Sequence, residues 1–127
     1  MYNYLKFAIF QIIGFISSLP LIRKFTKSPQ KYSNEEKFEF LQSQATKSLD
    51  LVNIKLNILG KERVPKEPVL FVINHSSMLD SFILISSIPK PVGVVIADVP
   101  TWRNIPIVKH WIDITKSVYI KIGRAHV

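Results

Sequence analysis

One histidine and one aspartate in this sequence are spaced so that they could carry out acid–base chemistry together. His75 and Asp80 lie five positions apart in the segment Asn-His-Ser-Ser-Met-Leu-Asp, which begins at Asn74. On a regular helix this separation places two side chains about 140° apart, so the pair can meet only if the chain bends between them. If His75 belongs to a turn and Asp80 to the helix that follows, the carboxylate can accept the Nδ1 proton, which leaves Nε2 as a general base. The same polar cluster could instead be a helix cap, and both roles can coexist.

The elements on either side of this pair predict a parallel sheet. Residues 69–73 are five consecutive apolar residues, which is typical of a strand buried on both faces at the centre of a sheet. Residues 81–87 are expected to form a helix over that sheet, and residues 92–96 a second strand. Strand, helix and strand imply a parallel crossover. His75 then lies just beyond the carboxyl end of a strand, where ligands gather in such sheets.

A helix is predicted over residues 34–50, because its apolar side chains recur every three or four positions. Ser33 and Glu36 can form a capping box at its start. Residues 52–58 alternate apolar and polar, which predicts a half-buried strand. The remaining predicted elements are a loop with short helical pieces at 100–111 and a strand at 118–120. The fold class is therefore α/β, with a mostly parallel sheet flanked by helices.

The N-terminal segment, residues 1–32, has the character of a membrane anchor. Residues 7–22 form an apolar run shorter than the roughly 20 residues that a spanning helix needs, so an interfacial helix and a spanning one both stay open. Residues 1–34 hold five basic side chains and no acidic one, which is membrane-flank patterning. An ordinary core helix is the alternative.

The composition limits the ligands that the chain can attract and the kinds of site that it can form. The chain has 17 Lys and Arg against 9 Asp and Glu, a formal charge of +8, which attracts nucleic acid, anionic lipid or phosphorylated substrates. It has no cysteine, which excludes disulfides, thiolate metal sites and a cysteine nucleophile.

The motif itself resembles a known family. The residues Asn74, His75, Ser77 and Asp80 match every fixed position of the Asn-His-x-Ser-x-x-Asp signature of the lysophosphatidate (1-acylglycerol-3-phosphate) acyltransferases. The lead-in Gly-Lys-Glu-Arg-Val-Pro, residues 60–65, is similar to the Gly-x-Glu-x-x-Pro turn of that family. The likeness covers about residues 50–121.

This resemblance implies an acyl transfer. His75 and Asp80 would be catalytic, Asn74 and Ser77 would support or orient them, and Ser76 need not be a nucleophile. The implied co-substrate is an acyl thioester, acyl-CoA or acyl carrier protein, and neither a metal nor another cofactor is expected. The implied partners are membrane phospholipid and lysophospholipid, with no nucleic acid, and the expected location is the cytoplasmic face of the cell membrane.

Family members also carry an arginine, thought to hold the acceptor phosphate, after a strand that corresponds to residues 118–120. That arginine is missing after Lys121, and Arg124 is misplaced for it. We expect residues 33–121 to be the N-terminal part of an acyltransferase domain, inactive as it stands. Residues 122–127 are expected to be a non-native tail, because Ile-Gly-Arg-Ala-His-Val and a stop would result from reading through a sequencing adapter. The candidates for attracting phosphate are Lys90, Lys109 and Lys116.

Two other classes of function compete with this one. The chain could be a non-catalytic basic membrane-surface protein, with His75 and Asp80 serving only as a local cap. Nucleic-acid binding is disfavoured, because the N-terminal charges flank an apolar run and no aromatic-basic strand motif occurs. His110 is interpreted as a surface or interfacial residue. The residues expected either at a membrane boundary or in packing are Trp102, Arg103 and Trp111.

Overall fold

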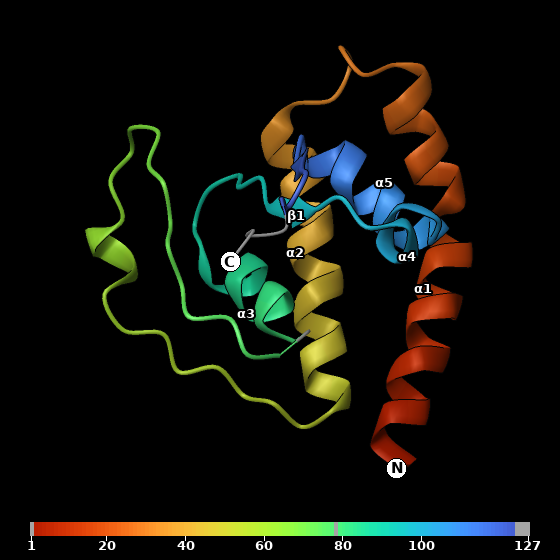
Figure 1. Ribbon diagram of the computed structural model, residues 1–127, viewed down its shortest axis with the longest axis horizontal. Helices are drawn as coiled ribbons and strands as arrows, with labels where there is room; N and C mark the ends of the chain where they lie inside the picture. The colour runs from red at the N-terminus through yellow and green to blue at the C-terminus, as the bar shows by residue number, and fades with distance from the viewer. Residues whose placement is uncertain (1, 78, 124–127) are drawn as a thin grey trace.

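The computed structural model describes residues 2–77 and 79–123, and helices dominate this part of the chain. The elements are α1 (Tyr2–Lys27), α2 (Asn34–Leu51), the short 3-10 helix η1 (Lys61–Arg63), α3 (Asp80–Ser87), β1 (Val95–Ala97), α4 (Pro100–Arg103), α5 (Pro106–Thr115) and β2 (Val118–Ile120). In Figure 1, α2 runs through the middle of the molecule, with α1 on one side and α3 on the other. The segment between α2 and α3 forms a long excursion away from these helices.

Helix α2 confirms the prediction for residues 34–50, including its start. Ser33 Oγ accepts a hydrogen bond from the Glu36 amide at 3.1 Å, and Glu36 Oε2 accepts one from the Ser33 amide at 2.7 Å. This capping box satisfies two amides that a helix start leaves without partners. The apolar face of α2 then forms the core, in which Leu41 and Ala45 are fully buried against Ile85 of α3.

The strand predicted at 52–58 is wrong, because its first residues end the helix instead. Asn53 takes a left-handed conformation with φ of 59°. The Asn53 amide donates to the Asp50 carbonyl and the Ile54 amide to the Leu49 carbonyl, both at 3.0 Å. This is the Schellman pattern of a helix end. The alternating burial continues to residue 57, but these residues form no strand.

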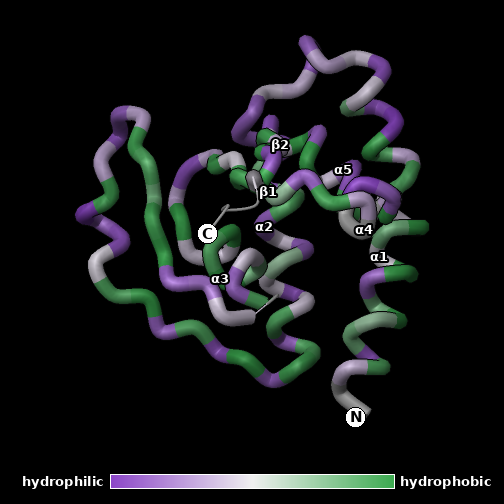
Figure 2. The backbone as a smooth tube through the Cα atoms, viewed as in Figure 1, coloured by the Kyte–Doolittle hydropathy of each residue, from purple (hydrophilic) through white to green (hydrophobic). Residues whose placement is uncertain are grey.

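The strand predicted at 69–73, as the centre of the sheet, is also wrong. These residues lie in the long excursion between η1 and α3, where Leu70 is 83% exposed and Val72 is 86% exposed. Figure 2 shows apolar residues, in green, along this excursion. A strand needs backbone partners as well as apolar side chains, and no strand in the described part of the chain pairs with residues 69–73.

The sheet within the described residues has two strands, β1 and β2, which pair in parallel with Val95 opposite Val118. Strand β2 confirms the prediction at 118–120, and β1 begins three residues later than predicted for 92–96. The parallel crossover therefore runs through α4 and α5 rather than α3. Within residues 2–77 and 79–123 the fold is helix-rich, with a small parallel sheet and an apolar N-terminal helix, and the larger predicted sheet is not found there.

Helix α1 has two faces of opposite character. On the inner face, Ile22 and Phe25 are buried, and Gln11 Nε2 donates to Ser48 Oγ of α2 at 2.6 Å. The outer face is an exposed apolar stripe, which lies within an arc of about 100° on a helix of this geometry and consists of Leu5, Ile9, Ile12, Ile13 and Ile16. These five residues are called the apolar stripe below.

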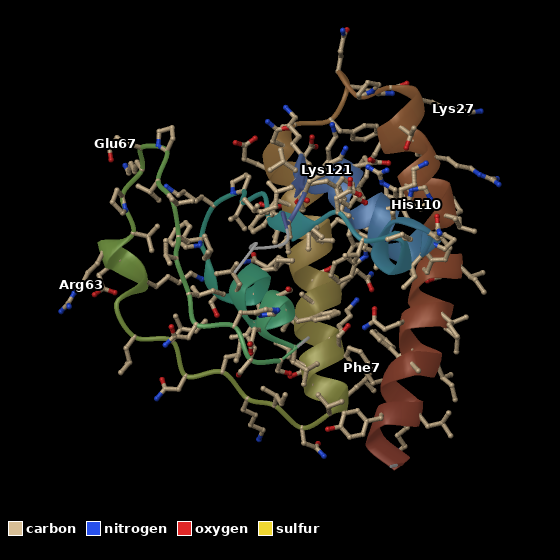
Figure 3. All side chains as sticks on the ribbon, in the orientation of Figure 1. Phe7, Lys27, Arg63, Glu67, His110 and Lys121 are labelled. Carbon is tan, nitrogen blue, oxygen red and sulfur yellow. The ribbon has the colours of Figure 1, made fainter. Side chains whose placement is uncertain are left out.

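Helix α1 is long and apolar enough to cross a membrane by length and composition, and 11% of its most apolar stretch is buried. Most of that stretch is thus exposed in the described residues, whereas the core helix of a soluble protein is mostly buried. Lys27, at the end of α1, points away from the other helices in Figure 3.

An aromatic contact joins three of the helices. The Phe82 ring of α3 meets Phe7 of α1 edge-on, with ring centroids 5.4 Å apart, and Trp111 of α5 at 5.1 Å. Such edge-to-face pairs contribute about 0.5–1.5 kcal/mol each beyond their buried area. The start of α3, which carries Asp80, is therefore held against both α1 and α5.

Candidate active site

The chain bends between His75 and Asp80, and the bend brings their side chains together. Asp80 is the first residue of α3, whereas His75 lies in the preceding irregular segment. His75 Nδ1 is 3.3 Å from Asp80 Oδ2. The His75 side chain is 61% exposed and that of Asp80 is 20% exposed. This arrangement leaves the outer ring nitrogen, Nε2, facing away from the carboxylate.

The same carboxylate oxygen is held by two backbone amides. Asp80 Oδ2 accepts hydrogen bonds from the amides of Ser76 at 2.7 Å and Ser77 at 2.8 Å. These two amides, followed by the nearby imidazole, hold the pKa of Asp80 below its ordinary value of 3.8, with partial desolvation opposing them. Position in the first helical turn also favours a negative charge there. Asp80 is therefore ionised at neutral pH and favours a proton on the facing His75 nitrogen.

Ser77 shapes the turn between the two residues. Its Oγ accepts a hydrogen bond from the Leu79 amide at 3.2 Å, and its carbonyl accepts one from the Asp80 amide at 3.1 Å. Its contacts are thus those of a turn residue just before the start of α3. Asn74 is exposed, and within the described residues no hydrogen bond from its side chain is found. The sequence does not reveal the role of the Ser76 and Ser77 amides, because every residue type except proline has one.

The lysines considered for phosphate are placed differently from one another. Lys90 Nζ donates to the carbonyls of Pro65 at 2.7 Å and Glu67 at 2.6 Å, and it lies 5.9 Å from the centre of the Phe71 ring. Its ammonium group therefore connects the segment after α3 to the tip of the long excursion by hydrogen bonds. The other two, Lys109 and Lys116, are exposed.

The remaining candidates mostly serve packing. Trp111 contacts Phe82 as described above, and the His110 ring stacks on Phe15 of α1 at 5.5 Å, beside α1 in Figure 3. Arg103 pairs with Asp98 at 3.1 Å and lies over the Tyr119 ring. The Trp102 side chain and Arg124 lie outside the described residues, as does most of the predicted tail at 122–127, which stays a prediction.

Comparison with known proteins agrees with the motif. Residues 55–126 match the acyltransferase family model. Over 83 residues the chain is 35% identical to a Mycoplasma pneumoniae protein named as a probable 1-acyl-sn-glycerol-3-phosphate acyltransferase, covering 65% of this chain and 31% of that protein. A Mycoplasma genitalium protein of the same name is 29% identical over 76 residues, which are 60% of this chain and 28% of that protein. No solved structure matches significantly.

Because the family match covers more than half of its residues, the chain belongs to the acyltransferase family. The resemblance seen in the segment from Asn74 to Asp80 is thereby confirmed at the level of the family. The chain spans less than a third of the length of either relative.

Proposed function

We propose that this chain is part of an enzyme that transfers an acyl group from a thioester, acyl-CoA or acyl carrier protein, to a lysophospholipid hydroxyl. Lysophosphatidate is the acceptor favoured by the names of the two relatives. The observation that carries the proposal is the 3.3 Å approach of His75 Nδ1 to an Asp80 carboxylate already held by two amides. The thioester is a co-substrate, and the reaction needs neither a metal nor another cofactor.

The proposed chemistry is general base catalysis by His75. Nε2 removes the proton from the acceptor hydroxyl as the oxygen attacks the thioester carbonyl carbon. The ester carbon–oxygen bond forms, the carbon–sulfur bond breaks, and the proton passes from His75 to the departing thiolate. Asp80 stabilises the imidazolium between these steps. A base of this kind contributes roughly 10²–10⁴-fold to the rate.

The proposed location is one leaflet of a membrane, with α1 lying at its surface. The inner face of α1 packs on the rest of the chain, so the apolar stripe is the part available to lipid. Three exposed basic residues follow the stripe on α1, namely Arg23, Lys24 and Lys27. Basic side chains beside an apolar helix favour the anionic cytoplasmic leaflet, by about 1 kcal/mol for each residue near the surface.

The test of the catalytic proposal is an acyl-transfer assay on protein expressed from the complete gene. Lysophosphatidate in vesicles and a radiolabelled acyl-CoA or acyl carrier protein are supplied, and labelled phosphatidate is counted. We expect His75→Ala to lower the rate by roughly 10²–10⁴-fold. His110→Phe is the matched control, because it removes the other described histidine while keeping a ring against Phe15. Full activity in His75→Ala would refute the assignment.

The second candidate is a non-catalytic protein of the membrane surface, which the apolar stripe and its basic neighbours favour. The same assay separates the two candidates. A wild-type protein that binds vesicles but forms no phosphatidate with either thioester supports the second.

A further inference from the structure

Gln42 of α2 is half-buried, and its side chain contacts several backbone carbonyls of α3. Its Nε2 lies 3.0 Å from the carbonyl oxygens of Ile85 and Ile88 and 3.5 Å from that of Ser86. All three carbonyls belong to the last turn of α3 or to the residue that follows it. One side-chain amide therefore contacts three carbonyls at the C-terminal end of α3.

These carbonyls have little access to other donors. The last carbonyls of a helix have no partner within the helix, and here Ile85 and Ile88 are 3% and 5% exposed. The amide nitrogen of Gln42 carries two hydrogens, which match the two closer carbonyls, those of Ile85 and Ile88. Thr46, one turn further along α2, adds a contact from its Oγ1 to Ser86 Oγ at 3.3 Å.

The other end of α3 carries Asp80. With eight residues, α3 is about 12 Å long and behaves as one hydrogen-bonded unit. Its apolar side chains alone allow it to slide or turn on α2, because apolar contacts have little directional preference. The Gln42 hydrogen bonds have a direction, so they define where α3 sits along α2. The turn of Ser76 and Ser77, in which the Asp80 carboxylate meets His75, is attached to the start of α3 and is positioned with it.

We infer that Gln42 is a positioning residue for the His75–Asp80 pair, which it orients from the far end of α3. For its effect on rate, this inference rests on the proposed function. Its effect on the geometry of the pair can be measured whether or not the chain is a transferase.

The test uses three variants of Gln42 and one control. Gln42→Glu has the same shape but places a carboxylate against the carbonyls, and Gln42→Met removes the donor without adding charge. Gln42→Lys restores a donor suited to a helix C-terminus. Gln44→Glu is the control, because Gln44 lies on the same helix but faces Gly14 of α1.

The first readout is the His75 tautomer, measured by ¹⁵N NMR on histidine-labelled chain in lipid bicelles. We expect the wild type to carry its proton on Nδ1, facing Asp80. Gln42→Glu and Gln42→Met shift the population toward the Nε2 tautomer, whereas Gln42→Lys and Gln44→Glu retain the wild-type signature. An unchanged His75 spectrum in a folded Gln42→Glu or Gln42→Met chain overturns the inference. If Gln42→Glu does not fold, Gln42→Met decides the matter.

The second readout is the kinetics of protein from the complete gene. We expect kcat to fall roughly tenfold in Gln42→Met with KM nearly constant, since misplacement of a catalytic group acts on the chemical step. Gln42→Lys recovers most of this loss. Equal losses in Gln42→Met and Gln44→Glu also overturn the inference, because they indicate general damage to α2. An inactive wild type with the expected tautomer shifts refutes the proposed function and leaves the positioning role supported.

Discussion

The apolar stripe on α1 leads to a quantitative prediction about membrane binding. Ile12 and Ile16 are 54% and 59% exposed and lie one turn apart on the outer face. Replacing both by serine removes apolar surface from this face without touching the inner face that holds Gln11 and Phe25. The double variant Ile12→Ser/Ile16→Ser should therefore fold normally and bind lipid more weakly.

The size of this loss follows from the exposed fractions. Transferring a whole isoleucine side chain out of water is worth about 1.5–3 kcal/mol. Because a little over half of each side chain is exposed, each contributes about 1 kcal/mol in contact with acyl chains, and the pair about 2 kcal/mol. At 1.4 kcal/mol for each factor of ten, the vesicle partition coefficient should fall roughly thirtyfold.

The assay is sedimentation with vesicles of mixed zwitterionic and anionic lipid, over a range of lipid concentrations. Leu59→Ser/Leu70→Ser is the matched control, because these leucines are 86% and 83% exposed but lie in the long excursion. We expect this control to change partitioning by less than about threefold, as two serines outside the lipid contact lose little transfer energy.

Two results would refute the reasoning. Equal weakening in both double variants means that the lipid contact is not specific to α1. Wild-type protein that resists extraction by alkaline carbonate is a spanning protein, in which case both faces of α1 contact lipid and its packing on α2 is not retained.

Three further predictions concern stability. Leu41→Ala should lower the free energy of unfolding by about 2–5 kcal/mol, because Leu41 is fully buried in the core, and urea denaturation followed by circular dichroism measures it. Ser33→Ala should cost about 1 kcal/mol in the same assay through loss of the capping box; an unchanged midpoint contradicts that role. Because the folded pKa of Asp80 lies below its ordinary value, its stabilising effect is present above pH 3.8 and is lost as pH falls through the lowered pKa. The wild type should therefore lose more stability than Asp80→Asn between pH 5 and pH 2, and parallel acid curves would exclude this linkage.

The helices could be predicted from sequence because their signals are local. The capping box of Ser33 and Glu36 and the apolar period of α2 lie within the helix or beside it, and α3 and β2 also appear where they were predicted. Strands 52–58 and 69–73 could not be predicted in the same way. Alternation and apolar runs report which side chains prefer burial, whereas a strand also depends on a partner far away in the chain.

In the candidate site, too, some features could be predicted from local sequence and others could not. The spacing of His75 and Asp80 required a bend, and the structure places one between them. The contacts that hold Asp80 could not be found from the pattern, because Ser76 and Ser77 act through their backbone amides. Gln42 is half-buried beneath the end of α3, where its amide binds backbone carbonyls. Polar side chains that bind backbone oxygens leave no periodic signal.

The aromatic contacts of Phe82 connect the helix proposed to bind lipid with the candidate site, so the two proposals predict a thermodynamic linkage. Phe7 belongs to the helix that carries the apolar stripe, and Phe82 to the helix that begins at Asp80. A bilayer that orders α1 reduces the conformational freedom left to α3, so a substrate that needs α3 ordered loses less entropy on binding. Linkage is reciprocal, so substrate must strengthen membrane binding by the same factor. We therefore expect substrate affinity to be higher at a lipid surface than in solution, even for a soluble short-chain acceptor that does not itself partition into lipid.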